Sequence, residues 1–267
     1  MAPGTVPYVS TDSIYRFVEP RSMSHVYDSD FMDYTSQSSR YSAQKTIAAL
    51  SKDISPVSVL DVGCARGTWL QEWAKAGIAD YYGVDGEYVD LERLDIPRDR
   101  FLAADLSKPF QLGRKFELVQ SLEVAEHIAA EFADVFVENL TRHASGAIFF
   151  SAAPPGQGGE FHVNEQPFDY WRKKFARHGY SAYDYVRPLL ANDRGISFWY
   201  RFNPIVYLAD ERAARMPDAV RATRVGDSDD IADVSPTWFK MRKRAIRALP
   251  FGMQQSLARL KARLATR

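Results

Sequence analysis

Two carboxylates and two imidazoles stand in two short segments of the chain where they can handle protons. Glu123, Glu126 and His127 follow a predicted strand within the run Ser121–His127, and His162 follows a later strand. The spacing allows Glu123 to share a helical face with Glu126 or His127. Strands of an open α/β sheet bind ligands at their carboxyl ends, so His162 is predicted at the same edge. An unperturbed imidazole is partly neutral at pH 7, so His127 or His162 can act as a general base, with Glu126 as a further catalytic candidate.

A turn of small residues joins an apolar strand, residues 57–62, to a helix that begins at Thr68. Small residues let the backbone approach a ligand closely, and a helix N-terminus offers free N–H groups to polar or anionic atoms. The turn therefore predicts a site for a nucleotide-like cofactor. No third glycine occurs at the pyrophosphate spacing, which disfavours NAD. The turn consists of Asp61, Val62, Gly63, Cys64, Ala65, Arg66 and Gly67.

Two further carboxylates follow the next two predicted strands. Asp85 and Gly86 end the second strand, and Asp105 and Leu106 follow the third. A carboxylate accepts charge-assisted hydrogen bonds from hydroxyl groups, which suits a ribose. Each acid by itself is equally compatible with a helix cap or a solvated loop. All three acidic positions in order, each at a strand end, favour a cofactor site.

This arrangement resembles class I S-adenosylmethionine (SAM)-dependent methyltransferases over about residues 30–210. Motif I of that family has an acid followed by three glycines at alternate positions, and here Ala65 replaces the middle glycine. The resemblance implies that Asp85 binds the ribose hydroxyls and that Asp105 binds the adenine amino group. It also implies cofactor contacts from Asp61, Gly63, Cys64, Ala65, Gly67, Gly86, Leu106, Ser121 and Leu122.

The Glu-x-x-Glu-His spacing with a later histidine resembles two narrower groups, the small-RNA 2′-O-methyltransferases and the ubiquinone O-methyltransferases. These groups bind a divalent metal at these positions, which implies metal ligation by Glu123, Glu126, His127 and His162. Such donors suit Mg, Mn or Zn without choosing among them. A metal there would lower the pKa of a substrate hydroxyl and hold it in line with the methyl group. The alternative is that the acids and histidines pack against the cofactor or make structural hydrogen bonds.

The run from Ser151 to Trp171, with Tyr34, Arg40 and Ser42 upstream, is similar to a bacterial methyltransferase group associated with surface-glycan and secondary-metabolite pathways. This resemblance implies a sugar or a related polar molecule as the acceptor. The glycines of residues 156–159 are interpreted as a mobile lid. Aromatic residues nearby either line a sugar-sized pocket or fill the core. They are Trp171, Trp199 and Tyr200, together with Arg201.

Strands that alternate with helices predict the fold. Such alternation is typical of a parallel sheet covered on both faces. We therefore expect an α/β, Rossmann-like, doubly wound fold with a mostly parallel seven-stranded sheet, helices on both faces and a basic helical C-terminal extension. The predicted strands cover residues 57–62, 81–84, 101–103, 116–121, 146–151, 182–186 and 202–208. The predicted helices cover residues 41–50, 68–76, 129–141 and 166–178.

Composition is that of an ordinary globular protein. The 267 residues include 34 basic and 34 acidic side chains, so the balance does not favour a nucleic-acid partner. The single cysteine, Cys64, cannot form an internal disulfide, which favours a cytoplasmic setting. The N-terminus lacks a signal-peptide pattern, and no apolar run is long enough to span a membrane.

The chain is predicted to divide into an N-terminal arm or lid at 1–40, a methyltransferase domain at 41–210, a linker at 211–236 and a tail at 237–267. The tail holds nine Lys or Arg residues and no Asp or Glu. Its leucines at helical spacing, Leu257, Leu260 and Leu264, predict an amphipathic helix. That helix can lie on an anionic membrane surface, which would make the protein membrane-peripheral, or it can be solvated or pack in a homodimer.

These observations predict a SAM-dependent methyltransferase that acts on an oxygen of a sugar, glycan or related small polar acceptor, with a divalent metal or a histidine assisting deprotonation. Three alternatives stay open at this point. They are an N-methyltransferase of small molecules, an RNA 2′-O-methyltransferase with a basic tail that binds RNA, and a cofactor-binding scaffold without catalysis.

Overall fold

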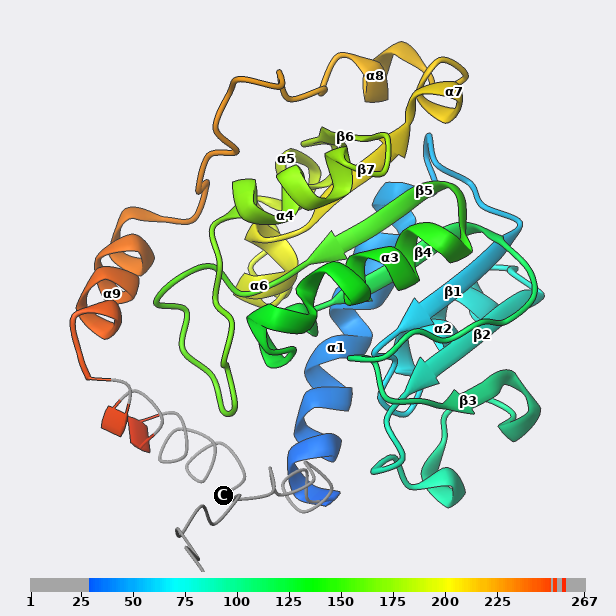
Figure 1. Cartoon of the computed structure of the whole chain (residues 1–267), viewed down its shortest axis with the longest axis horizontal. Coiled ribbons are helices and arrows are strands. Elements are labelled where there is room, and N and C mark those ends of the chain that lie inside the picture. The colour runs from blue at the N-terminus through cyan, green and yellow to red at the C-terminus, as the bar shows by residue number, and fades with distance from the viewer. Residues whose placement is uncertain (1–28, 251, 254–255, 258–267) are drawn as a thin grey trace, which may run out of the picture.

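Strand β5, Ala144–Ser151, shows why this sheet needs cover on both faces. Its residues Ala147 to Phe150 are apolar and buried. Ala147 and Phe149 pack in one hydrophobic cluster, whereas Ile148 and Phe150 pack in a second. Successive side chains of a strand point to opposite faces, so the two clusters lie on the two sides of the sheet. The sheet is therefore the middle of three layers (Figure 1).

The computed structural model describes residues 29–250, 252–253 and 256–257. Its sheet has the order β3-β2-β1-β4-β5-β7-β6. Every neighbouring pair is parallel except the two that involve β7, which is antiparallel to β5 and β6. The mostly parallel, seven-stranded, Rossmann-like fold predicted from the sequence is thus confirmed. The other strands are β1 Ser58–Val62, β2 Asp80–Asp85, β3 Phe101–Ala103, β4 Phe116–Leu122, β6 Tyr180–Tyr183 and β7 Ile205–Ala209.

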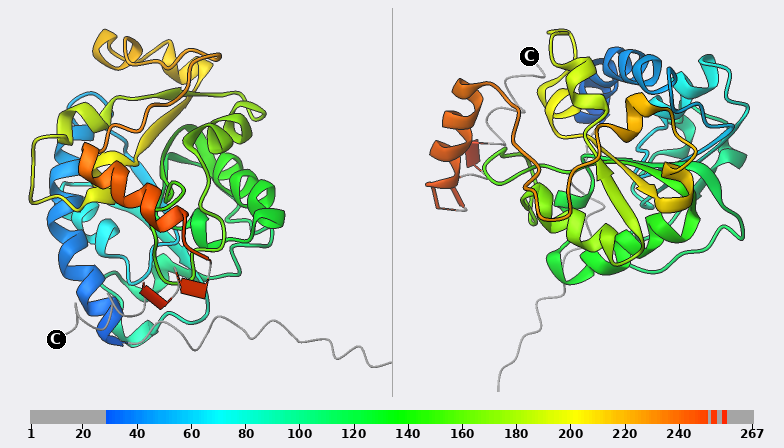
Figure 2. Two further views of the ribbon diagram at one scale, coloured as in Figure 1. Left: turned by 90° about the vertical axis from the view of Figure 1, so that its left-hand side faces the viewer. Right: turned by 90° about the horizontal axis from the view of Figure 1, so that it is seen from above.

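Helices α1, α2 and α5 contribute to the first cluster, and helices α3 and α4 contribute to the second, so the two helical layers lie on opposite faces (Figures 1 and 2). The α-helices are α1 Ser29–Leu50, α2 Thr68–Lys75, α3 Ala133–His143, α4 Phe168–Ala176, α5 Val186–Leu190, α6 Phe198–Phe202, α7 Asp210–Ala213, α8 Asp218–Arg221 and α9 Thr237–Arg247. The short 3-10 helices are η2 Leu91–Arg93, η3 Arg98–Arg100, η4 Ala125–His127 and η5 Ala130–Phe132.

Helix α1 begins at Ser29, whereas the sequence predicts its start at Tyr41. The added segment is rich in serine and has little helix propensity of its own. Further along, the helix is fixed to α2, where Arg40 and Gln44 donate hydrogen bonds to Glu72 at 3.1 and 2.9 Å. Residues 29–40 of the predicted arm are therefore helical, and residues 1–28 lie outside the described residues.

Residues 211–236, predicted as a linker, are packed on the domain. Val220 and Ile231 are buried, and Arg224 forms a β-bridge with Tyr183. The prediction followed the polar composition of the segment and did not anticipate its scattered buried apolar residues, which also include Ala213 and Met216. Likewise, the strand predicted at 182–186 ends at Tyr183. The apolar pattern that extended the prediction to residue 186 is shared with helix α5, which begins at Val186.

Helix α9 accounts for the beginning of the predicted tail. Of the leucines on which the predicted amphipathic helix rests, Leu260 and Leu264 lie outside the described residues. Among the described residues, no helix is both long and apolar enough to cross a membrane.

Replacing Gly63 with alanine is expected to destabilise the protein more than the same change at Gly77. Both glycines have positive φ, +86° and +99°, so each substitution carries the backbone strain of about 1 kcal/mol or more. A β-carbon at Gly63 would lie 2.3 Å from Cγ2 of Val124, whereas Gly77 faces open space. We expect Gly63→Ala to cost roughly 1–3 kcal/mol beyond Gly77→Ala in urea unfolding. Equal costs would show that Val124 moves aside freely.

Candidate active site

The small-residue turn is tied to the end of β2 through its backbone. The Gly63 N–H donates to the Val84 carbonyl oxygen at 2.8 Å, and the Ala65 N–H donates to Oδ2 of Asp85 at 2.6 Å. Ala65 has a φ of +50°, so it reproduces the left-handed conformation that the missing glycine would take. The turn between β1 and α2 therefore faces the Asp85 carboxylate, as the sequence predicts for a cofactor site.

The Asp85 carboxylate is buried, and burial raises its pKa. Its Oδ1 accepts hydrogen bonds from the Gly86 N–H at 2.7 Å and from the Tyr88 hydroxyl. A hydroxyl bonded to this oxygen is the kind of contact that a ribose would make. The residues present thus fit the predicted cofactor. Tyr88 was not identified from the sequence, because a tyrosine in a loop carries no signal of its own.

Asp61 is buried beneath the same turn. Burial raises its pKa, the nearby Gln120 amide lowers it and the neighbouring Asp85 raises it, and together they bring the pKa from the ordinary 3.8 to about 7. Burial also raises the pKa of the Cys64 thiol, so this cysteine is a small packing residue. Ser121 and Leu122 are buried at the end of β4, where the Ser121 hydroxyl donates to the Val62 carbonyl oxygen at 2.8 Å. Their cofactor contacts stay a prediction.

Asp105 lies in an exposed loop after β3. Its Oδ1 accepts hydrogen bonds from the Ser107 N–H at 3.0 Å and the Ser107 hydroxyl at 2.6 Å, and its Oδ2 pairs with Lys108 at 3.1 Å. Partial burial opposes ionisation, but these hydrogen bonds outweigh it and lower the pKa of Asp105. The local role of Asp105 is therefore to cap a turn, with Leu106 buried beside it. Its adenine contact stays a prediction.

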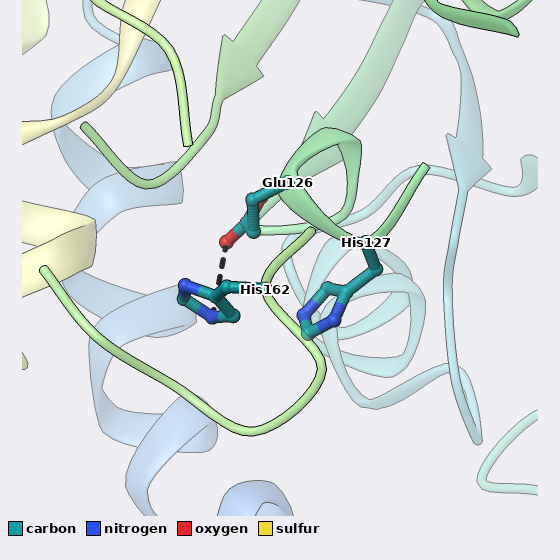
Figure 3. Close-up of side chains that lie close together, drawn as sticks. All are labelled: Glu126, His127 and His162. Atoms are coloured by element: carbon teal, nitrogen blue, oxygen red, sulfur yellow. Dashed lines mark ion pairs between the residues drawn. The ribbon is translucent and has the colours of Figure 1, made fainter. Parts of the chain in front are cut away.

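The structure brings together three of the four predicted metal ligands. Glu126, His127 and His162 each offer a ligand atom, and these atoms lie within 4.8 Å of one another. Figure 3 shows Glu126 and His127 coming from the turn after β4, with His162 reaching them from the loop after β5. The two imidazole rings meet edge to face with 4.9 Å between centroids.

Backbone contacts hold the two segments together. The N–H groups of Val163 and Asn164 both donate to the Glu126 carbonyl oxygen, at 2.9 and 3.0 Å. His162, which precedes these residues directly, is therefore held beside the Glu126 side chain. Two parallel strands that end at the same edge make this meeting possible.

Glu165 organises the loop that carries His162. Its Oε2 accepts from the Gly156 N–H, and its Oε1 accepts from the Gly158 N–H and faces Nδ1 of His162, each at 2.7 Å. Because a carboxylate oxygen accepts, Nδ1 of His162 donates and carries a proton. In the neutral ring the lone pair is then on Nε2, which lies 3.9 Å from Oε1 of Glu126. Glu165 was not identified from the sequence.

Glu126 is fully buried, and neither carboxylate oxygen has a hydrogen bond of normal geometry. Burial raises its pKa well above the usual range, and Glu123 raises it further; nearby backbone N–H groups, including that of Ala153, only partly offset this. Burial also lowers the pKa of His127 to about 3, so its imidazole is neutral at ordinary pH. A buried carboxylate beside neutral imidazole is a donor set that fits a divalent cation.

Glu123 is directed elsewhere. Its carboxylate accepts hydrogen bonds from the side-chain amides of Gln157 at 2.7 Å and Asn203 at 3.0 Å. Its backbone has a φ of +57°, so the chain turns sharply at the end of β4 instead of continuing as the helix that the spacing assumed. Among the described residues, the compact group of possible ligands therefore excludes Glu123. Gln157 and Asn203 were missed, because amides in loops have no distinguishing pattern.

Helix α9 closes over the glycines of residues 156–159. Arg242 donates to the Gln157 carbonyl oxygen at 2.9 Å. A β-carbon at Gly156 would lie 2.2 Å from the Lys243 carbonyl oxygen, so only glycine allows this approach. The loop interpreted as a lid is thus clamped between Glu165 on one side and α9 on the other.

The aromatic pocket suggested by the sequence is only partly available. Trp171 is 1% exposed and packs on Phe150, so it belongs to the core. Arg201 is buried and donates to the Asp193 carbonyl oxygen at 2.9 Å. Tyr200 contacts Trp69 edge to face at 5.1 Å, and burial raises its pKa to about 12. Trp171 and Arg201 therefore have structural roles.

Solved structures share this fold. DesVI from Streptomyces venezuelae is 16% identical over 68% of this chain and 100% of its own, with a TM-score of 0.51. A Nostoc punctiforme PCC 73102 protein, provisionally assigned as an O-methyltransferase, is 17% identical over 67% of this chain and 58% of its own, with a TM-score of 0.52. Magnesium protoporphyrin IX methyltransferase from Synechocystis PCC 6803, with bound S-adenosylhomocysteine, is 20% identical over 67% and 86%, with a TM-score of 0.49. At these identities the first two structures, with TM-scores above 0.5, show likeness of fold alone.

Residues 34–185, more than half of the chain, match the family model of the methyltransferase domain. The match begins in α1 and continues past the loop that carries His162. No curated protein matches the chain. The chain belongs to the methyltransferase-domain family. It is a SAM-dependent methyltransferase, as its sequence predicts.

Replacing Asp61 with asparagine is expected to stabilise the cofactor-free protein at pH 8 but not at pH 4. The unfolded Asp61 loses its proton near pH 4, whereas the folded one keeps it until about pH 7. The contribution of protonated Asp61 to the free energy of unfolding is therefore fully present below about pH 4 and is lost as the pH rises to about 7. The loss amounts to at most about 4 kcal/mol. Urea unfolding across this range measures it, with exposed Asp99→Asn as control. Parallel profiles for Asp61→Asn and the unmodified protein would contradict the prediction.

Proposed function

We propose that this enzyme transfers the methyl group of SAM to a hydroxyl oxygen of a sugar, glycan or related small polar acceptor, with a divalent metal at Glu126, His127 and His162. One observation carries the proposal. The buried Glu126 carboxylate lacks regular hydrogen bonds and faces a histidine nitrogen whose partner nitrogen is committed to Glu165. Two electron-pair donors that face each other in a buried site are stabilised by a cation between them.

The proposed metal site would be held by three residues of this chain. His127 contributes a neutral imidazole, Glu126 a carboxylate, and His162 an imidazole whose orientation is set by the hydrogen bond to Glu165. A bound divalent cation would lower the pKa of an acceptor hydroxyl and so favour the alkoxide that attacks the methyl group. Glu123 lies outside this group and is engaged by Gln157 and Asn203.

Positioning is the other part of the proposed mechanism. SAM supplies a methyl group on a sulfonium centre, so the acceptor oxygen needs chiefly to be held in line with it. The turn at Gly63–Gly67 and the buried Asp85 would hold the cofactor. Val124, which packs on Gly63, lies in the sequence between Glu123 and Glu126. The cofactor turn and the candidate metal site are therefore joined through adjacent backbone.

The proposed acceptor class rests on the resemblance of the run 151–171 to methyltransferases of glycan pathways, together with the polar character of this sheet edge. Carboxylates, imidazoles and amides converge there from three separate loops. Such groups suit a hydroxylated acceptor better than an apolar one.

The test is methyl transfer from labelled SAM to a panel of nucleotide-activated and free sugars, before and after chelation and with Mg, Mn or Zn restored. We expect chelation to reduce turnover at least a hundredfold, and Glu126→Gln and His162→Ala to do the same. Loss of a residue that only hydrogen-bonds to a metal ligand commonly lowers metal affinity or activity ten- to a hundredfold, and loss of a ligand should cost at least as much. Exposed Glu131→Gln and His178→Ala are the matched controls and should retain activity.

Binding of S-adenosylhomocysteine, measured by calorimetry, separates the two parts of the proposal. Both site variants should still bind it, since the cofactor turn is intact. Activity that survives chelation, with loss only in His127→Ala or His162→Ala, would replace the metal by a histidine base. Methylation of amines in place of hydroxyl groups would contradict the proposed acceptor.

A further inference from the structure

Helix α9 has an inner face whose contacts fix its orientation. Phe239 is buried and stacks on Phe198 of α6, with 5.0 Å between ring centroids and 14° between the ring planes. Lys243 is buried and donates to Oδ2 of Asp233 at 2.6 Å. With Arg242 bonded to the Gln157 carbonyl oxygen, these contacts determine which residues of α9 face outward.

The outer face carries exposed apolar side chains at helical spacing. Trp238 is 56% exposed and Met241 is 63% exposed, and Ala245 and Ala248 continue the same line. Trp238 rests edge to face on Phe198 at 5.1 Å, so one part of its ring is supported while the rest meets solvent. Figure 2 shows α9 on the outside of the molecule, with one side turned away from the sheet. Large exposed apolar side chains grouped on one helix face mark an interaction surface.

Charge selects the partner of this surface. Arg244 and Arg247 are exposed beside the apolar line, and residues 237–267 contain nine basic residues and no acidic one. Two copies of the chain that met through this face would place like charges together, which disfavours a second copy as the occupant. An exposed indole and a thioether between basic side chains match an interfacial helix on an anionic lipid surface.

We propose that the outer face of α9, formed by Trp238, Met241, Arg244 and Arg247, binds the surface of an anionic lipid bilayer. The helix would lie in the interface, with its basic side chains toward lipid phosphates and the Trp238 indole at the level of the headgroups. Because the inner face of α9 holds the loop of Gly156 and Gln157, the docked bilayer would lie near the rim of the candidate active site. This proposal does not depend on the acceptor or on a metal.

The test uses the full-length chain with vesicles of phosphatidylcholine, with and without phosphatidylglycerol. We expect co-sedimentation only with the anionic vesicles, weakened by salt, and a blue shift of tryptophan emission on binding. Arg244→Gln with Arg247→Gln should weaken binding roughly tenfold or more. Trp238→Ser with Met241→Ser should also weaken it, whereas Trp238→Phe should remove most of the blue shift and keep the binding.

Matched controls use exposed residues elsewhere on the chain, Leu189→Ser for the apolar change and Arg98→Gln for the charge change. Both should bind vesicles like the unmodified protein, and equal thermal unfolding of all variants excludes misfolding as a cause. Absence of binding, or equal binding to neutral vesicles, would overturn the proposal. A dimer in sedimentation velocity that Trp238→Ser disrupts would assign this face to a second copy, and salt-sensitive RNA binding lost in the arginine variant would assign it to RNA.

Discussion

The buried carboxylate of Glu126 is the constraint on which the rest of this site depends. A carboxylate without regular hydrogen bonds in a protein interior is unfavourable unless it is neutral or paired. Here the fold places two imidazoles beside it, and Nε2 of His162 lies 3.9 Å from its Oε1. The sheet makes this possible, because the parallel strands β4 and β5 end side by side and direct both following loops to one edge. Either a proton or a bound cation would neutralise the buried Glu126 carboxylate. A cation there would favour deprotonation of an acceptor hydroxyl, and a proton would leave that step to a histidine base.

The loop after β5 connects this site to the remainder of the molecule. One carboxylate, Glu165, accepts two backbone N–H groups and orients His162, so the loop has a defined shape although it contains little regular secondary structure. Arg242 of α9 fixes the same loop from outside, and the Gln157 side chain continues inward to Glu123. Helix α9 is thus in direct contact with the loop that carries part of the candidate active site, although the sequence presents it as part of a separate basic tail.

The sequence was sufficient for the fold, since alternating apolar strands and amphipathic helices leave few arrangements other than a doubly wound sheet. It also placed Asp85 beside the small-residue turn, because the turn follows the end of β1 and Asp85 lies at the end of the neighbouring strand β2. It did not predict the local backbone at Glu123, because the assumed helical spacing is replaced there by a turn with a φ of +57° that separates this side chain from Glu126, His127 and His162. Gln157 and Asn203 reach Glu123 through tertiary contacts that no local spacing encodes, whereas Tyr88 is only three residues from Asp85 but lies in a loop without a recognisable pattern. The packing of residues 211–236 depends on a few apolar side chains spread through a polar segment, among them Met216, Val220 and Ile231, which composition alone obscures.

The location of a bound cation would test the proposed metal site at Glu126, His127 and His162 most directly. Crystals of the full-length chain grown with S-adenosylhomocysteine and Mn²⁺, with diffraction measured on both sides of the manganese absorption edge, give the ion's position independently of any activity. We expect one anomalous peak within coordination distance of Glu126, His127 and His162, and we expect Glu126→Gln to remove it. A well-occupied cofactor with no anomalous peak at this cluster, or a manganese ion bound by Glu123 in place of Glu126, would contradict the proposed metal site.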